Sequence, residues 1–171
     1  MSKDNLAKNY SLKKNLTINA PLDKVWAVLS DFNDVYTWAP TVTHSYALNT
    51  KNQQIGAARH CDIKGFGGID EVVTQWEEKS GFTYTVSDLG PLTAAQSRWN
   101  IEQVDAHKTK LVVELAYNLK FSIIGKLLHS LIMKSKLSDS LEQTLIAVKN
   151  RVESGKLVRP LVVKKLSKSI A

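Results

Sequence analysis

Apolar residues recur with a helical period along the last third of the chain. From residue 121 to residue 153 the sequence is amphipathic, and its later apolar positions are separated by four, four, three and four residues. These positions are Leu137, Leu141, Leu145, Val148 and Val152. The spacing predicts one long helix with a continuous apolar face. Such a face needs an apolar surface to pack on, and the strands predicted before it would form one.

A shorter helix is predicted near the amino terminus, after a first strand over residues 10–18. Pro21 suits the first helical turn, because the N–H that it lacks would have no partner within the helix there. The apolar residues that follow have the spacing of one helix face, and they are Leu22, Val25, Trp26 and Leu29. A second short helical turn is expected around Val35 and Tyr36 and should end before Pro40.

Between residues 42 and 119 the pattern becomes that of β-strands. Runs rich in β-branched and aromatic residues alternate with short stretches that carry turn residues. The predicted strands cover residues 42–48, 55–63, 69–77, 82–88, 94–104 and 110–119. With the first strand they make seven, and their short connections predict antiparallel pairing.

Alternation along the strands predicts which side chains face inward. In the last strand the odd-numbered residues are the more apolar set, and they are Leu111, Val113, Leu115, Tyr117 and Leu119. Trp99 should face inward in the strand before it. In the middle hairpin, a loop over residues 65–68 would place Ala57, Arg59, Cys61 and Ile63 on one face with Val72, Thr74 and Trp76. A slip of one residue would reverse that pairing of faces.

Composition is that of an ordinary globular protein. The chain has 171 residues, of which 43% are hydrophobic and 23% charged, and this length is typical of one domain. We expect a single domain over residues 1–155 and a basic, apolar tail over residues 156–171. No signal-peptide pattern or run of 18 apolar residues is present, so a cytoplasmic protein is expected. The single cysteine, Cys61, cannot form an internal disulfide.

The net positive charge is confined to the carboxy-terminal third. Residues 120–171 contain 11 Lys or Arg against three acidic residues, whereas residues 1–119 contain 12 basic and 13 acidic residues. A solvated helix face followed by a disordered end would account for this. Contact with an anionic membrane or with RNA would account for it as well.

The order of elements and several local motifs resemble the START-like superfamily, also called SRPBCC, and within it the polyketide cyclase/dehydrase and lipid-transport group. The resembling segments are INAPLDKVWAVLSDF (18–32), WAP (38–40), IGAAR (55–59), IDEVVTQWEEKSGFTYTV (69–86), SRWNIEQVD (97–105) and ELAYNLKFSIIGKLL (114–128). The resemblance implies an α+β helix-grip fold: a curved seven-stranded antiparallel sheet around a long C-terminal helix, with two short helices after the first strand. It also implies a hydrophobic cavity between sheet and helix, but no single activity.

Eight residues are candidates for contact with a ligand in that cavity. Aromatic side chains would supply apolar area, and Tyr O–H and Trp N–H groups would orient polar atoms of the ligand. The candidates are Trp38, Arg59, Trp76, Tyr84, Trp99, Tyr117, Leu128 and Leu131. Each could instead simply fill the core. An inward Arg59 could bind an anionic group of the ligand, or it could pair with Glu71 or Asp62.

No motif in the sequence predicts a catalytic nucleophile, a cofactor or a metal. There is no GxSxG elbow, and GFGG at residues 65–68 lacks the lysine and helix of a phosphate-binding loop. His60, Cys61 and Asp62 are consecutive, so strand alternation separates the Cys61 side chain from the other two. Acid–base chemistry by Tyr84, His60 or Glu71 is still an open alternative.

Three hypotheses follow. The first is binding and transfer of a hydrophobic small molecule (a lipid, an isoprenoid or quinone, or a polycyclic aromatic), with an anionic membrane as a further partner and a monomer or weak dimer as the state. The second is an aromatase/cyclase-like enzyme acting on a polyketide-type substrate in the same cavity. The third, for which nucleic acid is the less favoured partner, is an RNA- or ribosome-binding module that uses the basic segment.

Overall fold

The computed structural model describes residues 10–88, 92–119 and 133–157. The chain forms β1 (Tyr10–Ile18), α1 (Leu22–Leu29), a short 3-10 helix η1 (Phe32–Asp34) and α2 (Val35–Trp38). It continues through β2 (Val42–Ala47), β3 (Ala58–Ile63), β4 (Gly67–Glu77), β5 (Gly81–Val86), β6 (Leu92–Asp105) and β7 (Lys108–Leu119), and ends in α4 (Lys134–Ser154).

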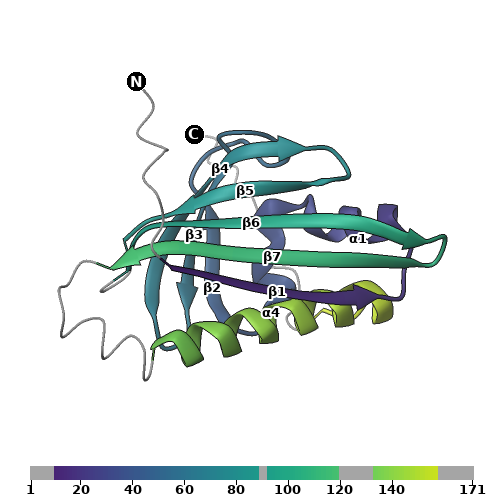
Figure 1. Ribbon diagram of the computed structural model, residues 1–171. Helices are drawn as coiled ribbons and strands as arrows, with labels where there is room; N and C mark the ends of the chain where they lie inside the picture. Colours follow the sequence, from purple (N-terminus) through teal and green to yellow (C-terminus); the bar gives the residue numbers. More distant parts are fainter. Residues whose placement is uncertain (1–9, 89–91, 120–132, 158–171) are drawn as a thin grey trace, which may run out of the picture.

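The seven strands form one antiparallel sheet in the order β1-β7-β6-β5-β4-β3-β2. Each strand from β2 to β7 pairs with the strand next to it in the sequence. The first strand, β1, pairs with the last, β7, so β1 and β2 are the two edge strands of the sheet. Figure 1 shows β2 and β3 turning steeply away from the direction of β1, β7 and β6, with α4 lying along the sheet. This is the predicted helix-grip architecture, and it is confirmed.

The inward faces of β6 and β7 are those predicted. Leu111 and Val113 are fully buried, and Tyr117 and Trp99 are almost so. Because these side chains point to one side of two long neighbouring strands, they give the sheet the continuous apolar surface on which α1 and α4 pack.

The middle hairpin has a different register from the predicted one. Its turn is shorter, because Ile63 pairs directly with Gly67 and the loop contains only three residues. Gly65 and Gly67 have φ values of +79° and +105°, a conformation that glycine adopts without strain. As a result Arg59 lies opposite Glu71 and Cys61 lies opposite Ile69.

The predicted faces of this hairpin are therefore partly corrected. Arg59 and Cys61 do face inward, at 6% and 1% exposure. Val72, which the prediction placed on that face, points to solvent and is 38% exposed. A bulge between Val73 and Gln75 then shifts the alternation, so that Trp76 returns to the core side.

The apolar face of α4 is the one that its period predicts. Leu137, Leu145, Val148 and Val152 are buried, and Leu141 packs partly buried against the same core. Polar contacts fix the helix along β1: Lys14 Nζ lies 3.0 Å from Glu142 Oε2, and the Lys149 ammonium donates to the Thr17 carbonyl oxygen at 2.8 Å. The helix ends at Gly155, which has φ +69° and donates its N–H to the Arg151 carbonyl oxygen.

Part of the predicted long helix, residues 121–132, lies outside the described residues, as do residues 158–171 of the predicted tail. No helix in the described ranges combines the length and apolar character needed to cross a lipid bilayer.

Candidate functional site

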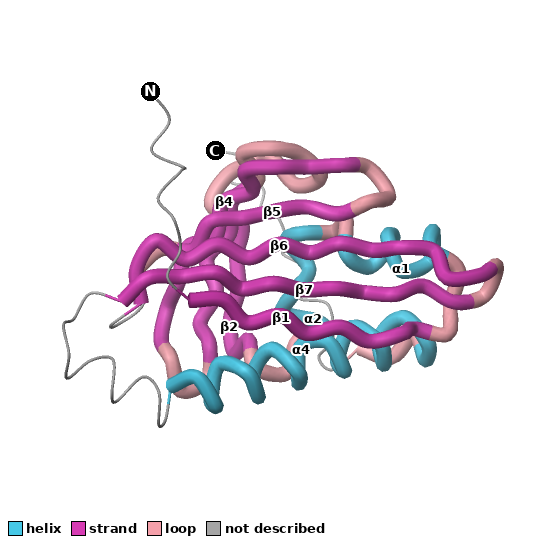
Figure 2. The backbone as a smooth tube through the Cα atoms, viewed as in Figure 1, coloured by secondary structure: helices cyan, strands magenta, loops and turns pink. Residues whose placement is uncertain are grey.

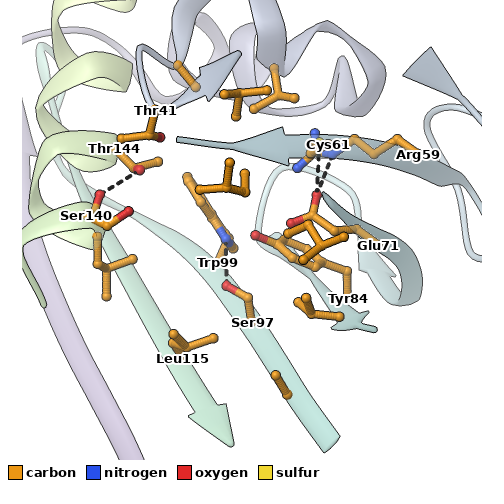
Figure 3. A pocket seen from close by; sticks show the side chains of 18 of the residues that line it. Thr41, Arg59, Cys61, Glu71, Tyr84, Ser97, Trp99, Leu115, Ser140 and Thr144 are labelled. Atoms are coloured by element: carbon orange, nitrogen blue, oxygen red, sulfur yellow. Dashed lines mark hydrogen bonds and ion pairs between the residues drawn. The ribbon is translucent and has the colours of Figure 1, made fainter. Parts of the chain in front are cut away.

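A cavity of about 160 Å³ lies between the inner face of the sheet, the α1–α2 region and α4. Every strand from β2 to β7 contributes to its wall, and the wall is mostly apolar. The helix contributes Leu137, Ser140, Leu141 and Thr144, which share one face because they are spaced three and four residues apart. Figure 3 shows Ser140 and Thr144 facing the cavity from the helix, across from Trp99 on the sheet.

A buried ion pair forms one part of the wall. Arg59 on β3 and Glu71 on β4 are opposite each other in the register, and Arg59 Nε donates to Glu71 Oε2 at 2.6 Å. Their side chains are only 8% and 7% exposed. Arg59 also donates to the Phe32 carbonyl oxygen and lies over the Phe32 ring, 3.9 Å from its centroid. The two hydrogen bonds use two of the five guanidinium N–H donors, and they hold the group against the Phe32 ring.

The charge state of this pair follows from its surroundings. Burial is the largest single influence and acts against the charged form of Arg59, but the attraction to Glu71, smaller contributions from Cys61 and Tyr84, and the hydrogen bond to Glu71 together outweigh it. The pKa of Arg59 is therefore raised above its ordinary value. The guanidinium therefore stays charged, and Glu71 balances that charge. To an incoming ligand the pair presents a polar but nearly neutral surface.

Two other polar side chains of the wall stay protonated. Burial, assisted by the nearby Glu71 carboxylate, raises the pKa of the Cys61 thiol to about 12. Burial first and the same carboxylate second also raise the pKa of the Tyr84 phenol. At neutral pH the cavity thus offers a thiol and a phenol as neutral groups, and Cys61 lacks the thiolate that a cysteine nucleophile requires.

Aromatic rings form a flat surface next to this polar region. The rings of Phe82 and Trp99 are stacked, with centroids 6.0 Å apart and planes 14° apart. Trp99 is oriented by its own N–H, which donates to Ser97 Oγ at 3.0 Å (Figure 3). A wall of parallel rings favours contact with another flat ring.

The structure places four of the eight candidate ligand residues at the cavity. Trp38, Arg59, Tyr84 and Trp99 line it. Trp76 does not: it packs against Trp26 and Phe82, with ring centroids 5.2 and 5.5 Å away. Tyr117 does not line it either: it stacks on Tyr10 at 5.6 Å, beside the cavity residues Leu92, Ala95 and Leu137. Leu128 and Leu131 lie outside the described residues. Contact with a ligand remains a prediction for each of the four.

Several wall residues were not among the candidates. Ala95, Ser97 and Leu115 could have been found by extending the inward alternation of β6 and β7 from Trp99 and Tyr117. Ser140 and Thr144 flank the apolar stripe of α4. The only sequence feature that could have indicated their place at the cavity is that they are small polar residues next to leucines. The position of Glu71 could not be read from the pattern, because it depends on the hairpin register.

Histidine and carboxylate groups do not gather at the cavity. Within the described ranges no three His, Cys, Asp or Glu side chains are placed so that they could hold a metal ion together.

Comparisons with known proteins agree with this architecture. The sequence profile of the family described as "Polyketide cyclase / dehydrase and lipid transport" matches residues 11–153. No curated protein sequence matches the chain with significance.

Three solved structures illustrate the fold. A START superfamily protein from Mycobacterium smegmatis has a TM-score of 0.69 and 18% identity, over 85% of this chain and 99% of that one. The Zhui aromatase/cyclase from Streptomyces sp. R1128 has a TM-score of 0.66 and 16% identity, over 86% and 98%. A protein from Thermus thermophilus has a TM-score of 0.69 and 16% identity, over 85% and 99%. At these identities the likeness concerns the fold alone.

Proposed function

The chain belongs to the polyketide cyclase/dehydrase and lipid transport family, and from this premise we propose that it binds, and transfers, a hydrophobic small molecule in the cavity between the sheet and α4. One observation carries the proposal: the cavity lies at the centre of the fold, and its wall is mostly apolar. Removal of apolar surface from water would supply the affinity, at about 25 cal/mol per Å² before ordering costs.

The size of the cavity narrows the ligand class. The cavity volume of about 160 Å³ is well below the roughly 300 Å³ at which pockets for drug-sized ligands begin. It is close to the volume of an engineered protein cavity of about 150 Å³ that binds benzene. The stacked Phe82 and Trp99 rings supply a flat contact surface. Among lipids, isoprenoids or quinones and polycyclic aromatics, we favour a ligand that places one ring in the cavity.

The polar region supports a neutral ligand. Arg59 is already paired with Glu71, so an anionic ligand would have to compete with a buried carboxylate 2.6 Å away. A neutral carbonyl or hydroxyl on the ring would bind without that competition. Quinone-type rings meet both conditions.

The proposal is tested with a neutral one-ring quinone, 2,3-dimethoxy-5-methyl-1,4-benzoquinone, whose binding is followed by quenching of tryptophan fluorescence. Ala95→Leu adds volume to the cavity wall, and we expect it to weaken binding of this probe at least tenfold. Ala116→Leu is the matched control on β7, because Ala116 does not line the cavity, and it should leave affinity within twofold. Equal affinity in both variants, with thermal midpoints unchanged, would contradict the proposal. Native mass spectrometry of the gently purified protein would then identify any bound natural ligand.

The aromatase/cyclase alternative is supported by the polar groups that meet at one end of the cavity. The Glu71 carboxylate is within 3.8 Å of the Cys61 thiol and also contacts Arg59, so an acceptor and several donors lie together. Product analysis after incubation with a linear poly-β-ketone tests it. A cyclase would change the product distribution relative to buffer, and Glu71→Gln would abolish that change.

A further inference from the structure

A second concave site lies outside the cavity, between the segment that follows α2 and the carboxy-terminal half of α4. Figure 2 shows α2 close to α4, and the two helices are in contact. This groove has a volume of about 480 Å³, three times that of the inner cavity. Trp38 lines both, so its side chain lies between them.

Two residues that line the groove carry a buried N–H donor with no acceptor among the described residues. Trp38 is only 5% exposed, and its indole Nε1 is without a hydrogen-bond partner. The other three tryptophans of the chain all have one: Trp26 and Trp76 donate to the Glu78 carboxylate and Trp99 donates to Ser97. Nε of Arg151 is likewise buried without a partner, although its Nη1 donates to the Gly155 carbonyl oxygen at 2.6 Å. Buried donors without acceptors are rare, so the groove lacks an acceptor that would complete it.

The charge of the groove indicates the kind of acceptor. Its described lining contains Arg151 and Lys156 and no Asp or Glu. The nearby carboxylate of Asp34 is not part of the lining. Burial raises the pKa of Asp34 above its ordinary value, although the Arg151 guanidinium acts to lower it. A single anionic group would therefore find two cations and two free donors.

The groove is also partly apolar. Ile146 and Leu157 are 46% and 37% exposed, which is high for side chains of this size, and Pro40 and Ala147 are beside them in the lining. An inorganic anion would leave this surface in water, whereas an amphipathic one would cover it.

We propose that this groove binds the phosphate or carboxylate group of an amphipathic molecule, with Trp38 Nε1 and Arg151 donating to the anion and Ile146 and Leu157 contacting its apolar chain. The site is separate from the ring-binding cavity and does not depend on the function proposed for it.

The test uses the four indole N–H signals of the full-length, ¹⁵N-labelled protein, with Trp38 assigned through Trp38→Phe. Titration with octyl phosphate should shift the Trp38 signal progressively and leave Trp26 and Trp76 in place. Octyl glucoside, which has the same chain without the charge, should not shift it. Inorganic phosphate should bind at least tenfold more weakly than octyl phosphate, which separates an amphiphile from a free anion.

Two substitutions locate the anion. Arg151→Gln should weaken octyl phosphate binding at least tenfold, and Lys156→Gln, at an exposed position that folding does not need, about threefold. Lys149→Gln is the matched control, since Lys149 is on the same helix but does not line the groove, and it should change affinity by less than twofold. Ala95→Leu in the cavity should also have no effect.

An unmoved Trp38 signal or equal affinity for octyl glucoside would overturn the proposal, and so would a shift of the Trp99 signal alone. The last result would place the amphiphile in the inner cavity. The double variant Leu161→Ser/Val162→Ser gives a further test, without any ligand. If its Trp38 signal differs from that of the wild type, the chain's own terminal segment occupies the groove, and the proposal is wrong.

Discussion

At the scale of single residues, the Arg59–Glu71 pair is the feature with the largest expected energetic consequence. Removing one partner of a buried ion pair leaves the other charge without compensation, which costs about 3–5 kcal/mol. We therefore expect Glu71→Gln to lower the free energy of unfolding by about 3 kcal/mol. Denaturant titration measures it, and Glu77→Gln, at an exposed end of the same strand, should cost less than about 0.5 kcal/mol. Similar losses for both variants would mean that Arg59 is solvated.

A second residue-scale feature is pH-dependent. On the outer face of the sheet His60 Nδ1 lies 2.6 Å from Asp70 Oδ1, and this hydrogen bond is the main reason that the pKa of His60 is raised above 6.5. The folded state therefore binds a proton more tightly than the unfolded state. The stabilisation is complete below pH 6.5 and disappears as the pH rises through the raised pKa.

Asp70→Asn tests this. At pH 5.5 we expect the free energy of unfolding of the variant to be lower than that of the wild type, by less than about 1 kcal/mol because Asp70 is exposed. At pH 8.5 the two free energies should be nearly equal. NMR titration of His60 should show its pKa fall in the variant. An unchanged pKa would mean that the contact does not persist in solution.

At the scale of elements, sequence patterns predicted the order and type of strands and helices, because periodicity survives errors of one or two residues at each end. The bounds of β1 and the apolar face of α1 are those predicted, although α1 begins at Leu22 and not at Pro21, whereas the predicted β3–β4 register was wrong. That register depends on the φ values of Gly65 and Gly67, which the apolar pattern does not encode. The sequence left Glu71 and Asp62 as alternative partners of Arg59, and the structure places Glu71 opposite Arg59 in the register, as part of the polar wall of the cavity.

The glycines at two turns give an element-scale prediction. A Cβ at Gly81, where φ is +151°, would collide with the backbone carbonyl oxygen of Trp99 in the neighbouring strand. Gly65 also has a positive φ, but a Cβ there would meet nothing within 4 Å. Gly81→Ala should thus cost more than the 1–3 kcal/mol typical of backbone strain alone, and Gly65→Ala should stay at about 1 kcal/mol. Thermal unfolding compares them. Equal losses would show that β5 and β6 can separate without penalty.

At the scale of the whole molecule, the fold separates two kinds of surface. The inner cavity combines stacked rings with a charge-balanced ion pair, and the outer groove combines apolar side chains with unbalanced positive charge. The resemblance to a helix-grip family implied such a cavity, and strand alternation pointed Arg59 and Trp99 toward it, but the ion pair was only one of several alternatives. The sequence could not predict the groove, because Trp38 and Arg151 are 113 positions apart and no sequence pattern links them.

Most of the positive charge of the carboxy-terminal third lies in segments other than α4. Of its 11 basic residues, only Lys134, Lys136, Lys149, Arg151 and Lys156 are in the described range, which also contains the acidic residues Asp139, Glu142 and Glu153. If an anionic membrane is the site of ligand transfer, the lysines of residues 158–171 should carry the attraction. Each lysine near such a surface contributes about 1 kcal/mol.

Full-length Lys164→Gln/Lys165→Gln/Lys168→Gln should accordingly lose roughly 100-fold in affinity for vesicles containing phosphatidylglycerol, measured by co-sedimentation at low salt. A control with equal charge loss, Lys51→Gln/Lys64→Gln/Lys108→Gln, removes three exposed lysines of the sheet region and should lose much less. Equal losses of affinity in the two variants would mean that the net charge of the protein, and not the position of these lysines, determines vesicle binding. If the tail variant instead kept its vesicle binding but lost salt-dependent binding to RNA, the basic segment would serve a nucleic-acid partner, and transfer of the ligand would have to proceed without a membrane-docking tail.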